Sequence, residues 1–126
     1  MKVLFDTHTF LWAAVEPERL SPKVRDFLDQ GGRPLVSVAS LWEIVIKVQK
    51  GKLSLDSPKQ ALLQAISDLA AEVLPVRLEH VLGVLRLKAH HKDPFDRLLV
   101  AQAVSEGAAI STVDEFVRMY PVDIFW

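Results

Sequence analysis

Short runs dominated by apolar residues recur along the chain. The first, Val3–Phe5, is wholly apolar and stops at Asp6, which is typical of a buried strand in a parallel sheet. Four further runs predict strands: Pro34–Val36, Glu72–Val76, Ala108–Ser111 and Val122–Phe125.

The segments between these runs carry helix signals. For example, Ser21 can cap a helix that begins at Pro22, and Gly31 stops the chain from continuing it. Helices are expected at Thr7–Ala14, at Pro22–Asp29, from Ser37 or Ser40 to Gly51, from Ser57 onward, at Leu78–Ala89, from Asp93 to Gly107, and briefly after Thr112. Strands that alternate with helices imply right-handed crossovers. We therefore expect an α/β fold, a three-layer α/β/α sandwich with a mainly parallel sheet of about five strands.

Length and composition narrow the class of protein. The 126 residues are enough for one domain, and no repeat or long linker divides them, so a single domain over 1–126 is expected. The absence of cysteine excludes a disulfide framework, a thiol nucleophile and a thiolate zinc site. A mean hydropathy of +0.20 is high for a small monomer. Either a partner or a second copy covers apolar surface, or the core is simply large.

The charge balance limits how the chain could hold a polyanion. Fifteen basic residues oppose sixteen acidic ones, so the molecule has no overall basic field, and a nucleic acid would need a local patch or a bound cation. The apolar stretch Leu35–Val48 is interrupted by Glu43 and Lys47, so no membrane span is predicted. The apolar start of the chain is too short for a signal peptide, and we expect a cytoplasmic protein.

Acidic residues lie just beyond the predicted strands, where sites form in open parallel sheets. Asp6 ends the first strand, and Asp114 lies three residues after the fourth. Asp93 and Asp96 open the helix that leads into the fourth strand, and Glu43 lies in the helix after the second. The topology can bring these acids to one rim of the sheet.

Each acid also has a structural interpretation. Asp6 and Asp93 can cap the helices that follow them, and Asp96 suits the positive end of its helix in any case. Glu43 precedes Lys47 by four residues, which is the favourable order for an ion pair on a helix.

Two features favour a metal-binding or catalytic role for these acids over a purely structural one. Thr112 and Glu115 match a capping box, which would leave Asp114 without a structural task. Glu43 lies among apolar neighbours, where a carboxylate is costly unless it is compensated. Two like charges about 4 Å apart cost about 4 kcal/mol at an effective dielectric constant near 20. Converging carboxylates are tolerated when a hard cation such as Mg²⁺ or Mn²⁺ lies between them.

Four segments resemble the PIN-domain ribonucleases of the VapC toxin type, in the family's order along the whole chain. They are Leu4–His8 with Leu11 and Trp12; Ser40–Ile44 with Lys47 and Gly51–Leu53; His91–Ala103; and Ile110–Asp114 followed by Tyr120–Val122 and Trp126. The third segment is the most specific. The resemblance implies a PIN fold with a Mg²⁺ or Mn²⁺ site built from Asp6, Glu43, Asp96 and Asp114. Asp93 would be an auxiliary acid or a helix cap.

One departure from the family concerns Asp114. Only Glu115 separates Asp114 from Phe116, where the family more often has two residues, so the turn is expected to be tighter.

The resemblance also implies an activity and partners. The chain would be an endoribonuclease that leaves a 5′-phosphate and a 3′-hydroxyl, the toxin of a type II toxin–antitoxin pair, homodimeric and inhibited by its antitoxin. The candidate contacts to RNA are Thr7, Ser40, Thr112, Lys47, Lys92 and Arg97. Caps and solvated faces are the structural alternatives for these residues.

Two other functions are weighed against this hypothesis. A catalytically inactive PIN-like module that binds RNA or a protein would not need four converging carboxylates. A phosphoacceptor domain of the haloacid-dehalogenase-like type would show a second Asp two residues after Asp6, where His8 stands.

The remaining aromatic and imidazole side chains are assigned to structure. The four histidines, His8, His80, His90 and His91, show no metal-ligand spacing and are expected at the surface or in the core. Trp42 is expected in the core rather than as a platform for a base.

Overall fold

A four-stranded, all-parallel sheet forms the centre of the molecule in the computed structural model, which describes residues 1–126. The strand order is β3–β2–β1–β4. The strands are β1 (Val3–Phe5), β2 (Leu35–Ser37), β3 (Glu72–Leu74) and β4 (Ala109–Ser111). In the central strand, Leu4 pairs with Leu35 on one side and with Ile110 on the other.

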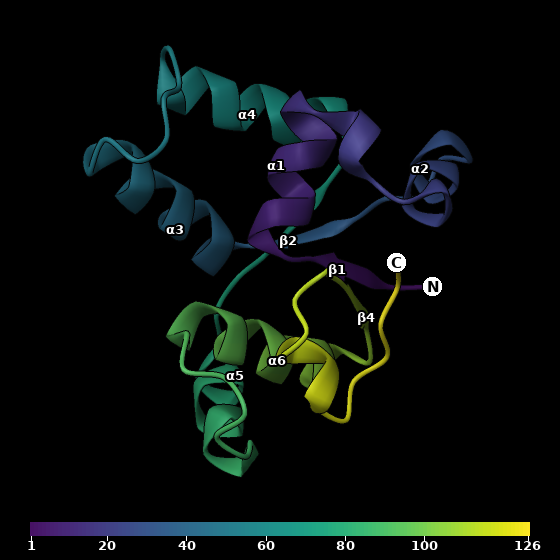
Figure 1. The fold of residues 1–126 in the computed structure, drawn as a ribbon, viewed down its shortest axis with the longest axis vertical. Helices are drawn as coiled ribbons and strands as arrows, with labels where there is room; N and C mark the ends of the chain where they lie inside the picture. Colours follow the sequence, from purple (N-terminus) through teal and green to yellow (C-terminus); the bar gives the residue numbers. More distant parts are fainter.

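Helices cover both faces of this sheet (Figure 1). The helices are α1 (Thr7–Val15), α2 (Pro22–Asp29), α3 (Val38–Gln49), α4 (Pro58–Asp68), α5 (Leu78–Gly83) and α6 (Pro94–Glu106), with 3₁₀ helices η1 (Pro17–Arg19), η2 (Val84–Arg86) and η3 (Val117–Met119). Helices α1 to α4 lie on one face, and α5 and α6 lie on the other. The expected three-layer α/β/α sandwich is confirmed.

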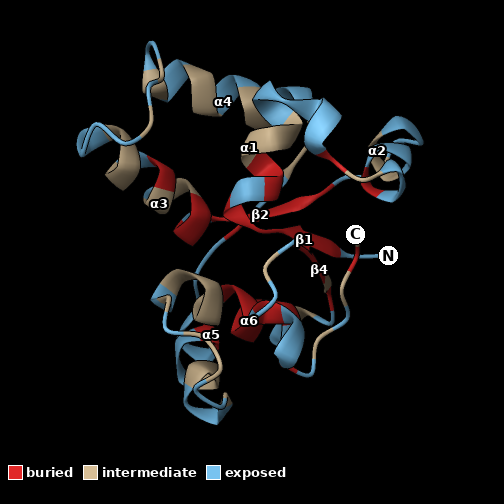
Figure 2. Ribbon diagram, viewed as in Figure 1, coloured by how far each residue is buried: buried red, intermediate tan, exposed pale blue.

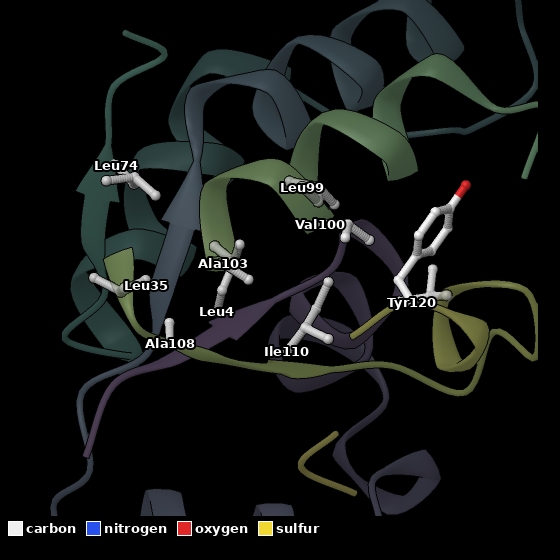
Figure 3. Packing of buried hydrophobic residues seen from close by; sticks show 10 residues of the cluster. Leu4, Leu35, Leu74, Leu99, Val100, Ala103, Ala108, Ile110 and Tyr120 are labelled. Carbon is white, nitrogen blue, oxygen red and sulfur yellow. The ribbon is translucent and has the colours of Figure 1, made fainter. Parts of the chain in front are cut away.

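The alternation of side chains along β1 divides the core into two clusters. Val3 and Phe5 belong to the cluster on the side of α1 to α4, together with Phe10 of α1 and Ile44 of α3. Leu4 points the other way, and its cluster includes buried residues of α6 and the neighbouring strands (Figure 3). Burial is greatest along β1, β2 and β4 and in the helices packed on them, whereas the edge strand β3 is mostly exposed (Figure 2). A strand buried on both faces explains why the apolar run at the start of the chain has no polar alternation.

The predicted fifth strand, Val122–Phe125, is reduced to a single parallel bridge between Ile124 and Ile110. Pro121 has no amide hydrogen to donate to a ladder, and the chain approaches β4 only after η3 has ended. The predicted helix over Leu78–Ala89 is also shorter, because α5 ends at Gly83 and only the 3₁₀ helix η2 continues it.

The crossover connections determine which helix ends meet. In a parallel sheet, each crossover helix runs antiparallel to the strands, so it begins at the edge where the strands end. Helix α1 begins directly after β1, α3 begins directly after β2, and α6 leads into β4. The first turns of α1, α3 and α6 therefore share one edge of the sheet. No helix has the length and the hydropathy that a membrane crossing requires.

Candidate functional site

Asp6 is buried at the carboxyl end of the central strand. Its amide donates to the Ser111 carbonyl at the end of β4, over 3.1 Å, which joins the ends of the two strands. Its Oδ1 accepts the amide hydrogen of Thr9 at 2.8 Å and so caps α1. The structural interpretation of Asp6 as a cap is therefore confirmed for one oxygen, and this pairing leaves Oδ2 free for other contacts.

The first turn of α6 and the loop after β4 bring two more acids to this edge. Asp93 caps α6, and its Oδ1 accepts the amides of Phe95 and Asp96. The imidazole of His91 lies between Asp96 and Asp114, with its Nε2 3.0 Å from Oδ2 of each carboxylate. Because the Nδ1 of His91 accepts the amide hydrogen of Asp93 at 3.1 Å, the neutral ring carries its proton on Nε2 and donates it to Asp114.

The expected capping box at Thr112 and Glu115 is wrong. Asp114 itself performs the capping, because its Oδ1 accepts the amides of Phe116 at 2.8 Å and Val117 at 3.1 Å. The hydroxyl of Thr112 accepts the amide of Asp114 instead. Asp93 makes the same pair of contacts with the amides two and three residues further along the chain.

The charges of the three other aspartates at this edge, Asp6, Asp93 and Asp114, all act on Asp96. Burial raises the pKa of Asp96 to about 7, and the charges of Asp93, Asp6 and Asp114 act in the same direction while His91 opposes them. Burial would also raise the pKa of Asp114, but the hydrogen bonds from His91 and from two backbone amides outweigh it and lower that pKa. Asp6, Asp93 and Asp114 are thus near enough to Asp96 to repel its negative charge, whereas Glu43 is not among the groups that shift this pKa.

Glu43 reaches the edge through α3 and is held by two side chains. Its Oε1 accepts a hydrogen bond from the Thr7 hydroxyl at 2.6 Å, and its Oε2 lies 3.3 Å from the ammonium group of Lys47. The predicted ion pair with Lys47 is confirmed. Thr7 directly follows Asp6 along the chain, so Glu43 is joined to the cluster through α1 rather than through Asp96.

The other predicted contacts to RNA differ in their surroundings. Thr7 and Thr112 are buried and hydrogen-bonded within the site, whereas Ser40 is buried and its hydroxyl has no partner. Arg97 is half-buried and its guanidinium donates to the Val84 carbonyl at 3.4 Å. Lys92 is exposed beside the acids Asp93 and Asp96 in the sequence.

Sequence reasoning missed His91 and misplaced Trp42. The ligand spacing that was searched for cannot find His91, because its two acidic partners lie five and twenty-three residues further along the chain. Trp42 is 61% exposed instead of buried. Its ring packs against Phe95 at 5.6 Å between centroids and lines an apolar hollow of about 470 Å³.

A second group of potential ligands, Glu79, His80 and Glu106, lies on the other side of α6. The Nδ1 of buried His80 accepts the amide of Arg77 at 3.0 Å and faces the Gln102 amide nitrogen at 3.3 Å. The proton of the neutral ring is therefore on Nε2, which points to Glu106 at 3.1 Å. A protonated Nε2 has no lone pair for a metal, so this group is structural.

Comparison with known proteins agrees with the fold. The sequence pattern of the PIN domain family matches residues 3–120. Ribonuclease VapC22 of Mycobacterium tuberculosis (strain ATCC 25618 / H37Rv) is 25% identical over 118 residues, which are 94% of this chain and 91% of that protein.

Two solved structures resemble the chain over nearly its full length. VapBC2 from Rickettsia felis, bound to a DNA fragment from the promoter, matches with a TM-score of 0.73 and 15% identity over 98% of this chain and 97% of that chain. DNA-bound VapBC from Salmonella typhimurium matches with a TM-score of 0.72 and 22% identity over 98% of this chain and 96% of that chain. These two likenesses show the fold, and the family pattern covers nearly all of the sequence. The chain belongs to the PIN domain family.

Proposed function

We propose that this chain is a divalent-metal-dependent endoribonuclease and the toxin of a toxin–antitoxin pair. The observation that carries the proposal is the convergence of Asp6, Asp96 and Asp114 at the edge where the strands end, in a chain whose curated relative is named a ribonuclease. Glu43, which Thr7 ties to the same edge, completes the proposed set of acids.

The side chains present fit a hard divalent cation. The proposed ligands, Asp6, Glu43, Asp96 and Asp114, offer only carboxylate oxygens, the donors that Mg²⁺ and Mn²⁺ prefer. Burial and the charges of the neighbouring acids hold the pKa of Asp96 at about 7 although His91 acts against them, so the carboxylates at this edge repel one another. A divalent cation would relieve this repulsion.

The residues of the chain would prepare the site in distinct ways. Asp6 and Asp114 each use one oxygen to cap a turn, which fixes the direction of the other oxygen. Thr7 and Lys47 hold the Glu43 carboxylate in place from two sides. When bound, a divalent cation would supply activation of a water molecule and stabilisation of charge on the cleaved phosphodiester. Asp93 holds the first turn of α6, and so the position of Asp96, through its cap.

The proposed protein partners are an antitoxin and a second copy of the chain. The outer side of α5 and η2 is apolar and strongly exposed, with Leu78 at 73% and Leu85 at 83%. Such a surface on a small protein marks an interaction site. It supports the interpretation that the high mean hydropathy reflects covered surface rather than a large core.

Cleavage of RNA by purified protein, with a titration of Mg²⁺ and Mn²⁺, tests the proposal. We expect defined fragments with 5′-phosphate and 3′-hydroxyl ends, no cleavage in excess EDTA, and loss of at least 100-fold in rate for Asp6→Asn and Asp96→Asn. The matched control is Asp29→Asn, which removes an exposed carboxylate at the end of α2. Failure of the wild type to cleave any RNA with either metal would support the inactive binding module instead.

A further inference from the structure

A hollow of about 380 Å³ opens between the loop that follows η2 and the turn at η3. It is connected to the carboxylates through the backbone, since His90 lines the hollow and the next residue, His91, contacts Asp96 and Asp114. One loop, from Lys88 to His91, therefore lines the hollow and also contacts the acids.

Tyr120 gives the hollow a fixed wall. Its ring lies at the edge of the core cluster and its hydroxyl points out of it (Figure 3). The hydroxyl donates to the Lys88 carbonyl at 2.7 Å and accepts the His91 amide at 3.0 Å. The ring of His90 packs edge-on against Tyr120, with 5.1 Å between centroids. These contacts hold the segment from Lys88 to His91 in place before any ligand arrives.

The remaining walls combine positive charge with apolar surface. Arg86 and Lys88 are exposed at the rim, and Leu87 and Met119 provide apolar contacts. Neither cation is compensated within the chain, because the ion pairs use other basic residues: Arg19, Lys47, Arg77, His80 and His91. In a chain with a net charge of −1, two unpaired cations beside an apolar slot favour an anionic ligand with a flat apolar part.

A nucleotide of single-stranded RNA has this chemistry. Unstacked bases bind against aromatic and other planar side chains, while their phosphates bind Arg and Lys. An acidic peptide would use the cations but not the apolar floor formed by Leu87 and Met119. The loop that lines the hollow also carries His91, which contacts Asp96 and Asp114, and this shared loop favours a part of the substrate over a separate protein.

We propose that this hollow is a nucleotide subsite of the nuclease, which binds one RNA nucleotide next to the cleaved phosphodiester. The base would lie against His90 and Met119, and its phosphate would bind Arg86 and Lys88. The inference rests on the proposed function and extends it by naming the residues that select the substrate.

Binding without cleavage tests the subsite. Fluorescence anisotropy in EDTA would measure how tightly the protein binds a pool of labelled single-stranded RNA hexamers. A ribose-phosphate oligomer of equal length that lacks bases would be measured in the same way. The variants are the double change Arg86→Ala with Lys88→Ala, and the single changes His90→Ala and Met119→Ala. The control is Lys59→Ala, an exposed lysine on α4, across the sheet from α5 and α6 (Figure 1).

The variants should separate phosphate contacts from base contacts. The double variant should weaken binding of both oligomers by about 10- to 30-fold and make the logarithmic salt dependence less steep by about 0.7, since both cations contact one phosphate and each neutralised phosphate on a single strand contributes about 0.7. His90→Ala and Met119→Ala should each weaken binding of the RNA hexamer by about 3- to 10-fold. Neither change should alter the affinity for the oligomer that lacks bases. Lys59→Ala should change neither value by more than twofold.

Three results would overturn the subsite. The first is an unchanged affinity for RNA in the double variant. The second is an equal loss of affinity for both oligomers in the His90→Ala variant. The third is displacement of bound RNA by a hexaglutamate peptide that binds more tightly than the RNA, which would assign the hollow to a protein. The melting temperature of each variant shows that any loss is not unfolding.

Failure of the subsite and failure of the proposed function give different results. If the wild type cleaves RNA with Mg²⁺ or Mn²⁺ while the double variant binds RNA normally, the subsite is wrong and the nuclease stands. If RNA binding depends on Arg86, Lys88 and His90 but no metal supports cleavage, the subsite stands and the nuclease is wrong.

Discussion

His91 donates its Nε2 hydrogen to Oδ2 of Asp114 over 3.0 Å, while two backbone amides occupy Oδ1 of the same carboxylate. Both oxygens of Asp114 are therefore engaged in the protein without metal. The same Nε2 is also 3.0 Å from Oδ2 of Asp96, so the imidazole occupies the place between two proposed ligands where a cation would be expected. His91 and the metal should compete for these oxygens.

Replacement of His91 by Ala tests this competition. Loss of the charge-assisted hydrogen bonds should lower the stability of the metal-free protein by about 1–3 kcal/mol. Mn²⁺ should then raise the melting temperature of His91→Ala more than that of the wild type, because no donor has to be displaced. Thermal unfolding with and without Mn²⁺ measures both effects. A smaller Mn²⁺ shift in the variant would mean that His91 assists the metal instead.

Asp96 should make the metal-free protein less stable at neutral pH than at pH 4. The pKa of Asp96 is about 7 in the folded protein and near 3.8 when unfolded, so the folded state binds the proton more tightly. The cost of ionising Asp96 is absent below about pH 4, grows between pH 4 and 7, and is complete above pH 7.

Replacement of Asp96 by Asn removes this cost. Because solvent screens the cluster, we expect a gain of about 1–2 kcal/mol at pH 8 in EDTA, declining to none at pH 4. Urea unfolding at several pH values provides the measurement. A variant that is less stable than the wild type at pH 8 would contradict the repulsion among these acids.

Thr7 should affect catalysis through Glu43. Thr7→Val removes the 2.6 Å hydrogen bond to Glu43 Oε1 and keeps the shape of the side chain, so cleavage should fall by about tenfold, with a loss of about 1 kcal/mol in stability. Thr9→Val is the matched control. Thr9 is equally buried, and its hydroxyl donates to the Ser111 carbonyl at 2.9 Å rather than to a carboxylate. Equal losses of cleavage in the two variants would leave no special role for the Thr7–Glu43 contact.

His80 should matter for stability and not for metal binding. His80→Ala would leave the Arg77 amide without its acceptor and the Gln102 side-chain nitrogen with only the Pro75 carbonyl, inside the packing of α5 against α6. A loss of about 2–4 kcal/mol is expected, since a cavity and unsatisfied polar groups are both created. Calorimetric titration with Mn²⁺ should give the wild-type affinity and stoichiometry. A reduced stoichiometry would show a second metal site at His80 and Glu106.

Local patterns in the sequence predict most of the helices and strands and the acids that each of them carries. Apolar runs without alternation specify strands that are buried on both faces, and residues such as Ser21 and Asp93 cap helices through contacts with their own neighbours in the chain. The edge of the sheet that carries Asp6, Asp96 and Asp114 also follows from topology, because crossover helices begin where parallel strands end.

The hydrogen-bond and ion-pair partners of those acids depend on contacts between distant segments and do not follow from local patterns. The position of His91 between Asp96 and Asp114 depends on the hydrogen bond from its amide to the hydroxyl of Tyr120, near the end of the chain. No rule of residue spacing predicts that contact. The exposure of Trp42 and the reduction of the fifth strand to one bridge also depend on packing between distant segments. Local patterns specify which conformations a segment favours, whereas contacts between distant segments depend on how the whole chain packs.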